Sequence, residues 1–339
     1  MATDRELLIV SSDTWAEVEE ASSVGLLRLM SGAIGGAAVS AAAAALLTPQ
    51  LRQRLKVPSW LLWLTASIAA AITVNELVGK PVPFLRWSVL TMMLRGRHLL
   101  REWQVGDGRE TALEKYVLAR ACPGDVDDAI RVIDHFGRHV SFLINVGDEK
   151  GKILDRAVER TQPRLLLELG TYCGYSALRM ARVMPREARL YSVEFNTANA
   201  AIARRILAHA GVDDKVTVIV GTLGDGGETI RTLRREHNFV PGSLDLVFLD
   251  HDKKAYLSDL ELIIDAGWLH PGSVVVADNI LVPGAPAYRA HMRHNDGTLW
   301  HTTEHRTHAE YQSVIKDLVL ESDYLGTQTS STGTSRPER

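Results

Sequence analysis

Residues 164–176, RLLLELGTYCGYS, decide the fold that this sequence predicts. Three consecutive leucines and an acid, Glu168, are followed by a loop that contains Gly170 and Gly174. Such a short apolar run predicts a buried strand, and the glycines after it predict a tight turn. Helical spacing resumes at Ser176. A strand, a glycine loop and a helix in this order form the first unit of a nucleotide-binding α/β fold.

The loop pattern also restricts the ligand. It is E-x-G-x-x-x-G, which differs from the G-x-G-x-x-G of dinucleotide-binding folds and disfavours a nicotinamide-dependent oxidoreductase. A carboxylate at the strand end suits a cationic or amino-acid-bearing ligand better than a pyrophosphate. S-adenosylmethionine, a sulfonium, is such a ligand.

Length and composition set outer limits. The chain has 339 residues, for which about two domains are expected, and a formal net charge of −3. This balance, with no block of basic residues and interleaved aromatics, gives no reason to expect a nucleic-acid partner. The two cysteines, Cys122 and Cys173, form neither a disulfide framework nor a metal-binding spacing.

Apolar residues are concentrated near the N-terminus. An acidic tail (1–23) precedes two apolar segments, 24–47 and 58–78, and each is about as long as the ~20 residues that a membrane-spanning helix needs. A buried helical hairpin is the alternative, but neither segment has a polar face for water. Residues 80–110 are basic and amphipathic and are expected at the membrane surface. We therefore expect the lipid bilayer as a partner, in the endoplasmic reticulum or plasma membrane. Basic residues both in the loop at 52–56 and beyond the second segment leave the orientation of the two spans open. If S-adenosylmethionine is the ligand, its cytosolic supply favours a cytosolic location for the domain that follows.

Residues 111–326 have the composition of a soluble domain. Further strands are expected at 189–194, 216–220, 244–250 and 273–278, alternating with helices, and a closing hairpin at 300–306 and 315–324. This alternation predicts a Rossmann-like α/β fold with a seven-stranded, mostly parallel sheet and a C-terminal antiparallel hairpin. Residues 327–339 are expected to be a disordered tail.

Polar residues end several of these strands, where an open parallel sheet binds its ligand. Glu194 is placed to accept the hydroxyls of a ribose. Asp250, Asp278 and Asn279 offer three oxygen ligands suited to Mg²⁺, and capping of the following helices is the alternative role. Next to Asp250, one of three side chains could take a proton from a substrate hydroxyl: His251, Lys253 or Lys254. The histidines near residue 300 have a spacing that would suit a zinc site on a helix face, but residues 300–306 alternate like a strand, which disfavours zinc.

Residues 145–324 resemble catechol O-methyltransferases. The resemblance lies in NVGDEKG at 145–151, LELGTYCGYS at 167–176, DKVT at 214–217, LDLVFLDH at 244–251, ADN at 277–279, PGAP at 283–286 and EY at 310–311. The N-terminal layout is similar to that of the membrane-bound and transmembrane members of the family.

The resemblance implies a role for each matched position. The residues that would bind S-adenosylmethionine are Val146, Glu168, Gly170, Tyr172, Ser176, Glu194, Asp250 and His251. Those that would bind Mg²⁺ are Asp250, Asp278 and Asn279. Lys253 would be the catalytic base for one catechol oxygen, Glu310 would bind the other, and Phe142 and Pro283 would contact the ring.

The sequence also departs from the family pattern. Asp252 and Phe142 each stand where the family has a tryptophan, and Leu223-Gly224 replaces a Ser-Gln pair that reaches the adenine. The function implied is a membrane-anchored, Mg²⁺-dependent methyl transfer from S-adenosylmethionine to one hydroxyl of a catecholamine-like catechol. The alternative is a transmembrane adaptor that keeps the fold and acts by binding a membrane protein.

Overall fold

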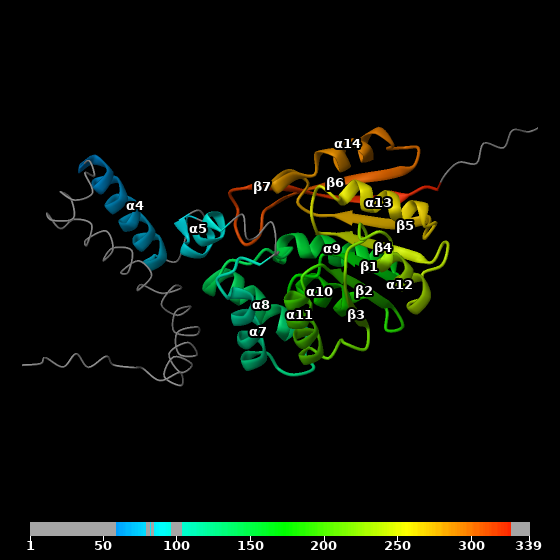
Figure 1. The fold of residues 1–339 in the computed structure, drawn as a ribbon, viewed down its shortest axis with the longest axis horizontal. Coiled ribbons are helices and arrows are strands. Elements are labelled where there is room, and N and C mark those ends of the chain that lie inside the picture. The colour runs from blue at the N-terminus through cyan, green and yellow to red at the C-terminus, as the bar shows by residue number, and fades with distance from the viewer. Residues whose placement is uncertain (1–58, 79–81, 83–84, 96–103, 327–339) are drawn as a thin grey trace, which may run out of the picture. The chain divides into compact units, whose positions relative to one another are not determined.

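The computed structural model describes residues 59–78, 82, 85–95 and 104–326 (Figure 1). The chain divides into two compact units. The N-terminal unit comprises Met1–Tyr116 and His135–Phe142, and the sheet unit comprises Val117–Asp134 and Leu143–Arg339. The expected acidic tail (1–23), the first apolar segment (24–47) and the C-terminal tail (327–339) lie outside the described residues, so these expectations remain predictions.

A seven-stranded sheet forms the centre of the sheet unit. Its strand order is β3-β2-β1-β4-β5-β7-β6. The first five strands are parallel, and β7 runs antiparallel to both β5 and β6. The strands are β1 (Leu165–Leu169), β2 (Arg189–Glu194), β3 (Val216–Val220), β4 (Leu244–Leu249), β5 (Leu269–Ala277), β6 (Trp300–His308) and β7 (Lys316–Tyr324). The predicted mostly parallel sheet with a C-terminal antiparallel hairpin is confirmed.

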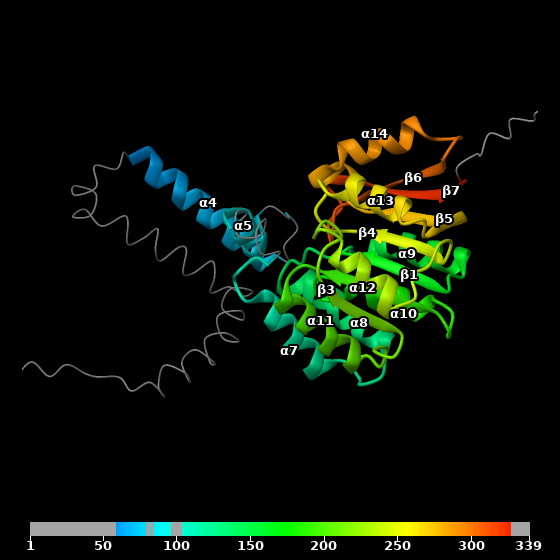
Figure 2. The same ribbon diagram turned by 45° about the vertical axis from the view of Figure 1, so that its right-hand side comes forward.

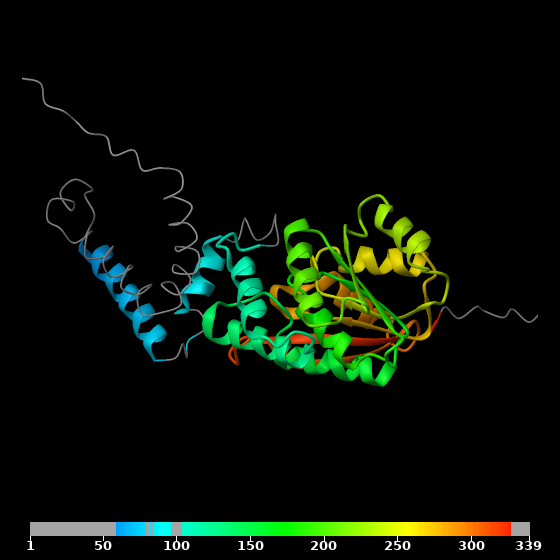
Figure 3. The same cartoon turned by 90° about the horizontal axis from the view of Figure 1, so that it is seen from below.

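Helices cover both faces of this sheet (Figure 2, Figure 3). Helix α9 packs against α10, and α13 packs against α14. The helices of this unit and its boundary are α7 (Arg109–Arg120), α8 (Val126–His135), α9 (Gly147–Thr161), α10 (Tyr175–Val183), α11 (Thr197–His209), α12 (Glu228–Glu236), α13 (Tyr256–Asp265), the π-helical turn η3 (Ile280–Gly284) and α14 (Pro286–His294). The sequence analysis did not predict α14, which begins with a proline in its first turn, a position where proline is favoured.

The central strands are buried along almost their whole length. In β1, β4 and β5 the last four residues of each strand are buried, as expected for parallel strands covered on both faces. Strand β5 begins four residues earlier than predicted, because residues 269–272 extend it across a register shift opposite β4. The ladder then aligns Leu169 with Leu249 and Leu249 with Ala277. The carboxyl ends of β1, β4 and β5 therefore lie side by side.

Two buried arginines hold the N-terminal unit together. It contains α4 (Ser59–Leu77), α5 (Trp87–Leu94) and the π-helical turn η2 (Phe136–Val140). Arg86 donates to the carbonyls of Gly137 and Arg138 at 2.9 and 3.0 Å. Arg109 donates to the carbonyls of Ser88 and Phe142 and pairs with the Asp107 carboxylate. Both guanidinium groups are thus occupied by backbone of their own unit, and membrane-surface binding by residues 80–110 remains a prediction.

The second apolar segment forms a helix at nearly its predicted bounds. Helix α4 covers Ser59–Leu77, close to the predicted 58–78. Its C-terminal turn is polar: Asn75 is buried, and its side chain exchanges two hydrogen bonds with the backbone of Val82. Across the described ranges, no helix combines the length and the apolar character needed to cross a membrane.

Candidate active site

The glycine loop after β1 is shaped by close backbone contacts. Gly170 has φ +99°, and a Cβ atom at this position would lie 2.6 Å from the carbonyl oxygen of Asp250. Only glycine fits here, because both the left-handed conformation and the contact exclude a side chain. Tyr172 has φ +48°, and Gly174, with φ +88°, precedes the first turn of α10. The N-terminus of α10 therefore begins beside the carboxyl edge of the sheet.

Glu194, the last residue of β2, holds this loop. Its Oε2 accepts hydrogen bonds from the N–H groups of Thr171 and Tyr172 at 3.1 and 2.8 Å, and its Oε1 accepts one from Asn196 at 2.8 Å. Burial raises the pKa of Glu194, and these hydrogen bonds oppose the shift. The carboxylate thus orders the loop, a role that the sequence analysis did not foresee. The predicted contact with a ribose remains a prediction.

Glu168 is a fully buried acid at this edge. Its Oε2 accepts a short hydrogen bond from Ser192, whose hydroxyl also contacts Thr171. Its Oε1 is buried and has no hydrogen-bond partner among the described residues. Burial raises the pKa of Glu168 to about 8, against the effect of the Ser176 and Ser192 hydroxyls. In the free protein the carboxyl is therefore mostly protonated near neutral pH, and a bound cation would favour its ionised form.

Asp250 and Lys253 meet just after β4. The Lys253 Nζ lies 2.8 Å from Asp250 Oδ1 and donates to the hydroxyl of Tyr256 at 2.7 Å. The Tyr256 hydroxyl in turn donates to the carbonyls of Leu249 and Asp278 at 2.7 and 3.2 Å. Two fixed acceptors therefore hold the lysine head group, and Tyr256 is a site residue that the sequence analysis missed.

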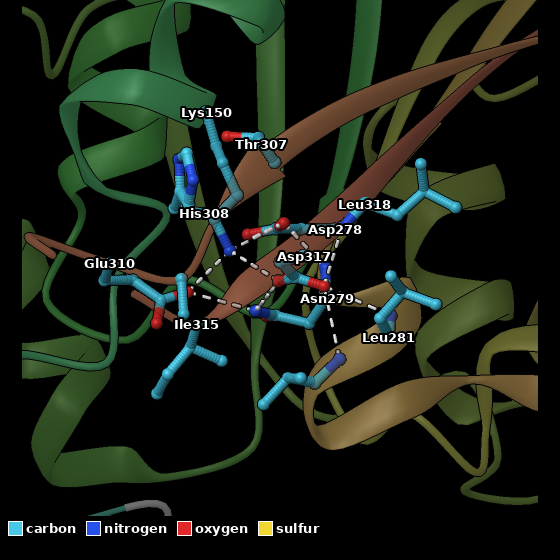
Figure 4. A network of polar contacts seen from close by, with 12 residues as sticks. Lys150, Asp278, Asn279, Leu281, Thr307, His308, Glu310, Ile315, Asp317 and Leu318 are labelled. Atoms are coloured by element: carbon cyan, nitrogen blue, oxygen red, sulfur yellow. Dashed lines mark hydrogen bonds and ion pairs between the residues drawn. The ribbon is translucent and has the colours of Figure 1, made fainter. Parts of the chain in front are cut away.

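Asp278 and Asn279, after β5, belong to a second cluster, drawn in Figure 4. Lys150 Nζ lies between three carboxylates, at 2.9 Å from Asp278 Oδ1, 2.6 Å from Glu310 Oε1 and 3.2 Å from Asp317 Oδ2. The Asn279 side-chain amide donates to Glu310 and Asp317 at 3.0 and 3.1 Å. The structure thus brings the predicted Asp278, Asn279 and Glu310 together, and adds Lys150 and Asp317.

The charges of the two clusters do not balance. The charged side chains are the carboxylates of Asp250, Asp278, Glu310 and Asp317 and the ammonium groups of Lys150 and Lys253, which gives a formal sum of 2 − 4 = −2. Burial raises the pKa of Asp278 to about 7, although Lys150 opposes the shift, and it also raises the pKa of Asp250. Asp278 Oδ2 is buried without a partner among the described residues. An uncompensated negative site of this kind suits a cation.

The set of possible metal ligands is small. In the part of the chain that the structure describes, no group of three or more His, Cys, Asp or Glu side chains is placed to hold a metal. A cation bound here would therefore rely on two aspartates and the amide oxygen of Asn279. Water or substrate would complete its coordination, as is usual for Mg²⁺.

The remaining predicted residues lie in several places. His251 Nε2 is paired with Asp259 at 2.9 Å, and its Nδ1 is buried without a hydrogen-bond partner among the described residues. Val146 and Ser176 are buried at the starts of α9 and α10. Pro283 lies within η3. Phe142 belongs to the N-terminal unit, where its N–H donates to the Ser88 hydroxyl at 3.1 Å.

Comparison with known proteins identifies similar chains. A family model described as O-methyltransferase matches residues 134–301. A protein named as a probable O-methyltransferase from Mycobacterium tuberculosis is 62% identical over 230 residues, which cover 68% of this chain and 98% of the relative. Catechol O-methyltransferase from Bos taurus is 37% identical over 74% of this chain and 82% of the relative. A transmembrane O-methyltransferase homolog from Mus musculus is 35% identical over 71% of this chain and 90% of the relative.

Proposed function

This chain belongs to the O-methyltransferase family, and from that premise we propose that it transfers a methyl group from S-adenosylmethionine to one hydroxyl of a catechol with the help of Mg²⁺. The observation that carries the proposal is the negative cluster at the ends of β4 and β5. It combines an unpartnered buried carboxylate oxygen with a lysine held close by. The similarity to catechol O-methyltransferase from Bos taurus supports the choice of substrate.

The methyl donor would bind at the ends of β1 and β2. S-adenosylmethionine supplies the methyl group and carries an amino group and a sulfonium, both cationic. Glu168 suits such a ligand, because its buried carboxyl has one unpartnered oxygen and would gain a counter-charge on binding. Glu194 keeps the glycine loop in place through the backbone N–H groups of Thr171 and Tyr172, so the loop is already ordered when the ligand arrives.

The substrate would bind between the two clusters. When bound, Mg²⁺ would lower the pKa of the catechol hydroxyls and neutralise the excess charge of the carboxylates. In its neutral form, Lys253 can accept the proton of one hydroxyl, because Asp250 and Tyr256 fix the position of its nitrogen. Glu310, which is partly exposed, can accept a hydrogen bond from the second hydroxyl. Catalysis would then consist mainly of positioning and charge stabilisation.

The test is a methyl-transfer assay on the full chain with S-adenosylmethionine. A simple catechol should be methylated in the presence of Mg²⁺, and turnover should be lost with a chelator. The matching monophenol should react much more slowly, because it offers one oxygen where the site would bind two. Equal rates on the two substrates, or full activity with all divalent metal chelated, would contradict the proposal.

Two variants separate the roles of the residues. Asp250→Ala and Lys253→Ala should both abolish turnover of the catechol, but only the first should greatly weaken Mg²⁺ binding. Lys254→Ala is the matched control, because this exposed neighbouring lysine has no side-chain partner among the described residues. Loss of activity in Lys254→Ala but not in Lys253→Ala would reassign the base.

A further inference from the structure

Strand β7 brings a buried acid to the carboxyl edge of the parallel strands. Because β7 is antiparallel to β5, Ala277 at the end of β5 pairs with Leu320. The start of β7 therefore runs alongside the residues that follow β5. Asp317, the second residue of β7, lies there with a side chain that is 0% exposed. It contacts the segment that carries Asn279.

Both oxygens of Asp317 are used. Its Oδ1 accepts hydrogen bonds from the backbone N–H groups of Leu281, Val282 and Leu318 at 3.1, 3.2 and 2.8 Å. Its Oδ2 accepts from Lys150 Nζ and Asn279 Nδ2 at 3.2 and 3.1 Å (Figure 4). The carboxylate is thus a junction between the backbone of η3, the lysine of α9 and the side chain of Asn279.

These contacts fix the orientation of the Asn279 amide. Its nitrogen lies within hydrogen-bond distance of two carboxylate oxygens, Glu310 Oε1 and Asp317 Oδ2. Ionised carboxylates only accept hydrogen bonds, so the side of the amide that faces them must be the NH₂ group. Both of its hydrogens are then engaged, and the Asn279 oxygen points away from the two acids.

We propose that Asp317 is a positioning residue that holds the Asn279 amide with its oxygen presented to the divalent cation. The inference rests on the proposed function, because it assumes the cation site at Asp250, Asp278 and Asn279. Asp317 itself would touch neither the cation nor the substrate. It acts on the side chain that does, as partners behind metal ligands commonly do.

The test is Asp317→Asn in the full chain, with Mn²⁺ as the probe and electron paramagnetic resonance to count free metal. The new amide could place its NH₂ group against the Asn279 NH₂ group and the Lys150 ammonium, which would release the Asn279 amide. If it turned instead, its oxygen would still accept from Asn279, but its NH₂ group would face the N–H groups of Leu281 and Val282 and displace the backbone directly after Asn279. We expect Mn²⁺ affinity to fall about 10- to 100-fold, the usual effect of removing such a partner.

Asp323→Asn is the matched control. It makes the same chemical change on the same strand, at a partly exposed carboxylate that pairs with Arg160. Its Mn²⁺ affinity should equal that of the wild type. If Asp317→Asn is folded and binds Mn²⁺ as the wild type does, the inference is overturned while the proposed function stands. If the wild type binds no Mn²⁺, the metal-dependent function fails and the inference fails with it.

A second measurement reads the amide itself and needs no folded Asp317 variant. In wild-type protein labelled with ¹⁵N at asparagine, the side-chain signals of Asn279 are those missing from Asn279→Ser. Their two hydrogens should exchange slowly with solvent, before and after Mg²⁺ is added, because both remain bonded to carboxylates. Exposed Asn238 provides the fast reference. If the Asn279 hydrogens exchanged as fast as those of Asn238, with or without Mg²⁺, the inference would be overturned. This measurement changes no charge near the site, so it reports on the amide hydrogen bonds themselves.

Discussion

Replacing Lys150 with methionine should strongly destabilise the sheet unit. The ammonium group is 1% exposed and lies within 3.2 Å of three carboxylates. Removing one partner of a buried ion pair typically costs about 3–5 kcal/mol, since the remaining charges stay buried without compensation. At roughly 2–4 °C per kcal/mol for a unit of this size, the melting temperature should fall by about 6–20 °C.

The matched control is Lys152→Met, two residues along α9, where the lysine is exposed. Its effect should be that of an ordinary surface substitution, within about 0.5 kcal/mol. Mg²⁺ should raise the melting temperature of Lys150→Met more than that of the wild type, because the cation would compensate the same carboxylates.

Lowering the pH should reduce the effect of Lys150→Met. In the folded protein, burial raises the pKa of Asp278 to about 7 from an ordinary value of 3.8. An acid with a raised pKa destabilises the fold once the pH rises above its unfolded pKa, and protonation removes this penalty. Without Lys150, which lowers this pKa, Asp278 in the variant should take up its proton at a higher pH than in the wild type. The part of the stability difference that Asp278 causes should therefore shrink as the pH falls toward about 7. Equal melting temperatures for the two lysine variants, or a difference independent of pH, would refute the buried-charge explanation.

Three further predictions concern other parts of the chain. Glu194→Ala should weaken S-adenosylmethionine binding, measured by calorimetry, by about 1.5–3 kcal/mol, the range for hydrogen bonds to a charged group. Glu187→Ala, at an exposed site, should not weaken it. Unchanged affinity in Glu194→Ala would remove Glu194 from the ligand site. Glu168→Gln should make the ligand-free protein more stable than the wild type, by an amount that grows as the pH rises from about 4.5 to about 8, since the folded wild type retains a proton that the unfolded chain releases. A stability difference that stays constant with pH would argue against the raised pKa. Arg109→Met should speed hydrogen exchange around Phe142, whose carbonyl the arginine binds. Lys115→Met, exposed on the same helix, should leave this exchange unchanged; equal exchange in both variants would mean that Arg109 does not hold this segment.

The sheet could be predicted because its central strands are buried on both faces. Such strands appear in the sequence as short apolar runs, and the residue after each run then marks the carboxyl edge of the sheet. This rule placed Glu194, Asp250 and Asp278 at the ends of their predicted strands. In the structure Glu194 ends β2, whereas Asp250 and Asp278 directly follow the last residues of β4 and β5. The site acids supplied by parallel strands were therefore readable from local pattern alone.

Lys150 and Asp317 could not be found in the same way. Both are charged residues in helical or strand stretches, where a charge usually indicates a solvated face. Lys150 stands in the NVGDEKG stretch that carried the family resemblance, so the motif marked this part of the chain. Its carboxylate partners, however, begin 128 residues further along the chain, at Asp278. Asp317 had no local signal, because nothing in its own strand distinguishes it from a solvent-facing strand end.

The position of β7 explains both omissions. The order of elements along the chain suggests a hairpin added at the edge of the sheet, with β7 outermost. Instead β7 is inserted between β5 and β6, so its first residues lie against the ends of the parallel strands. The parallel strands place their C-terminal residues at this edge of the sheet. Because β7 runs in the opposite direction, it places its N-terminal residues at the same edge. Asp317 is buried there for this reason, and Lys150 of α9 can be buried because Asp317 completes its set of carboxylate partners. The pairing of the last strand is thus part of the construction of the site.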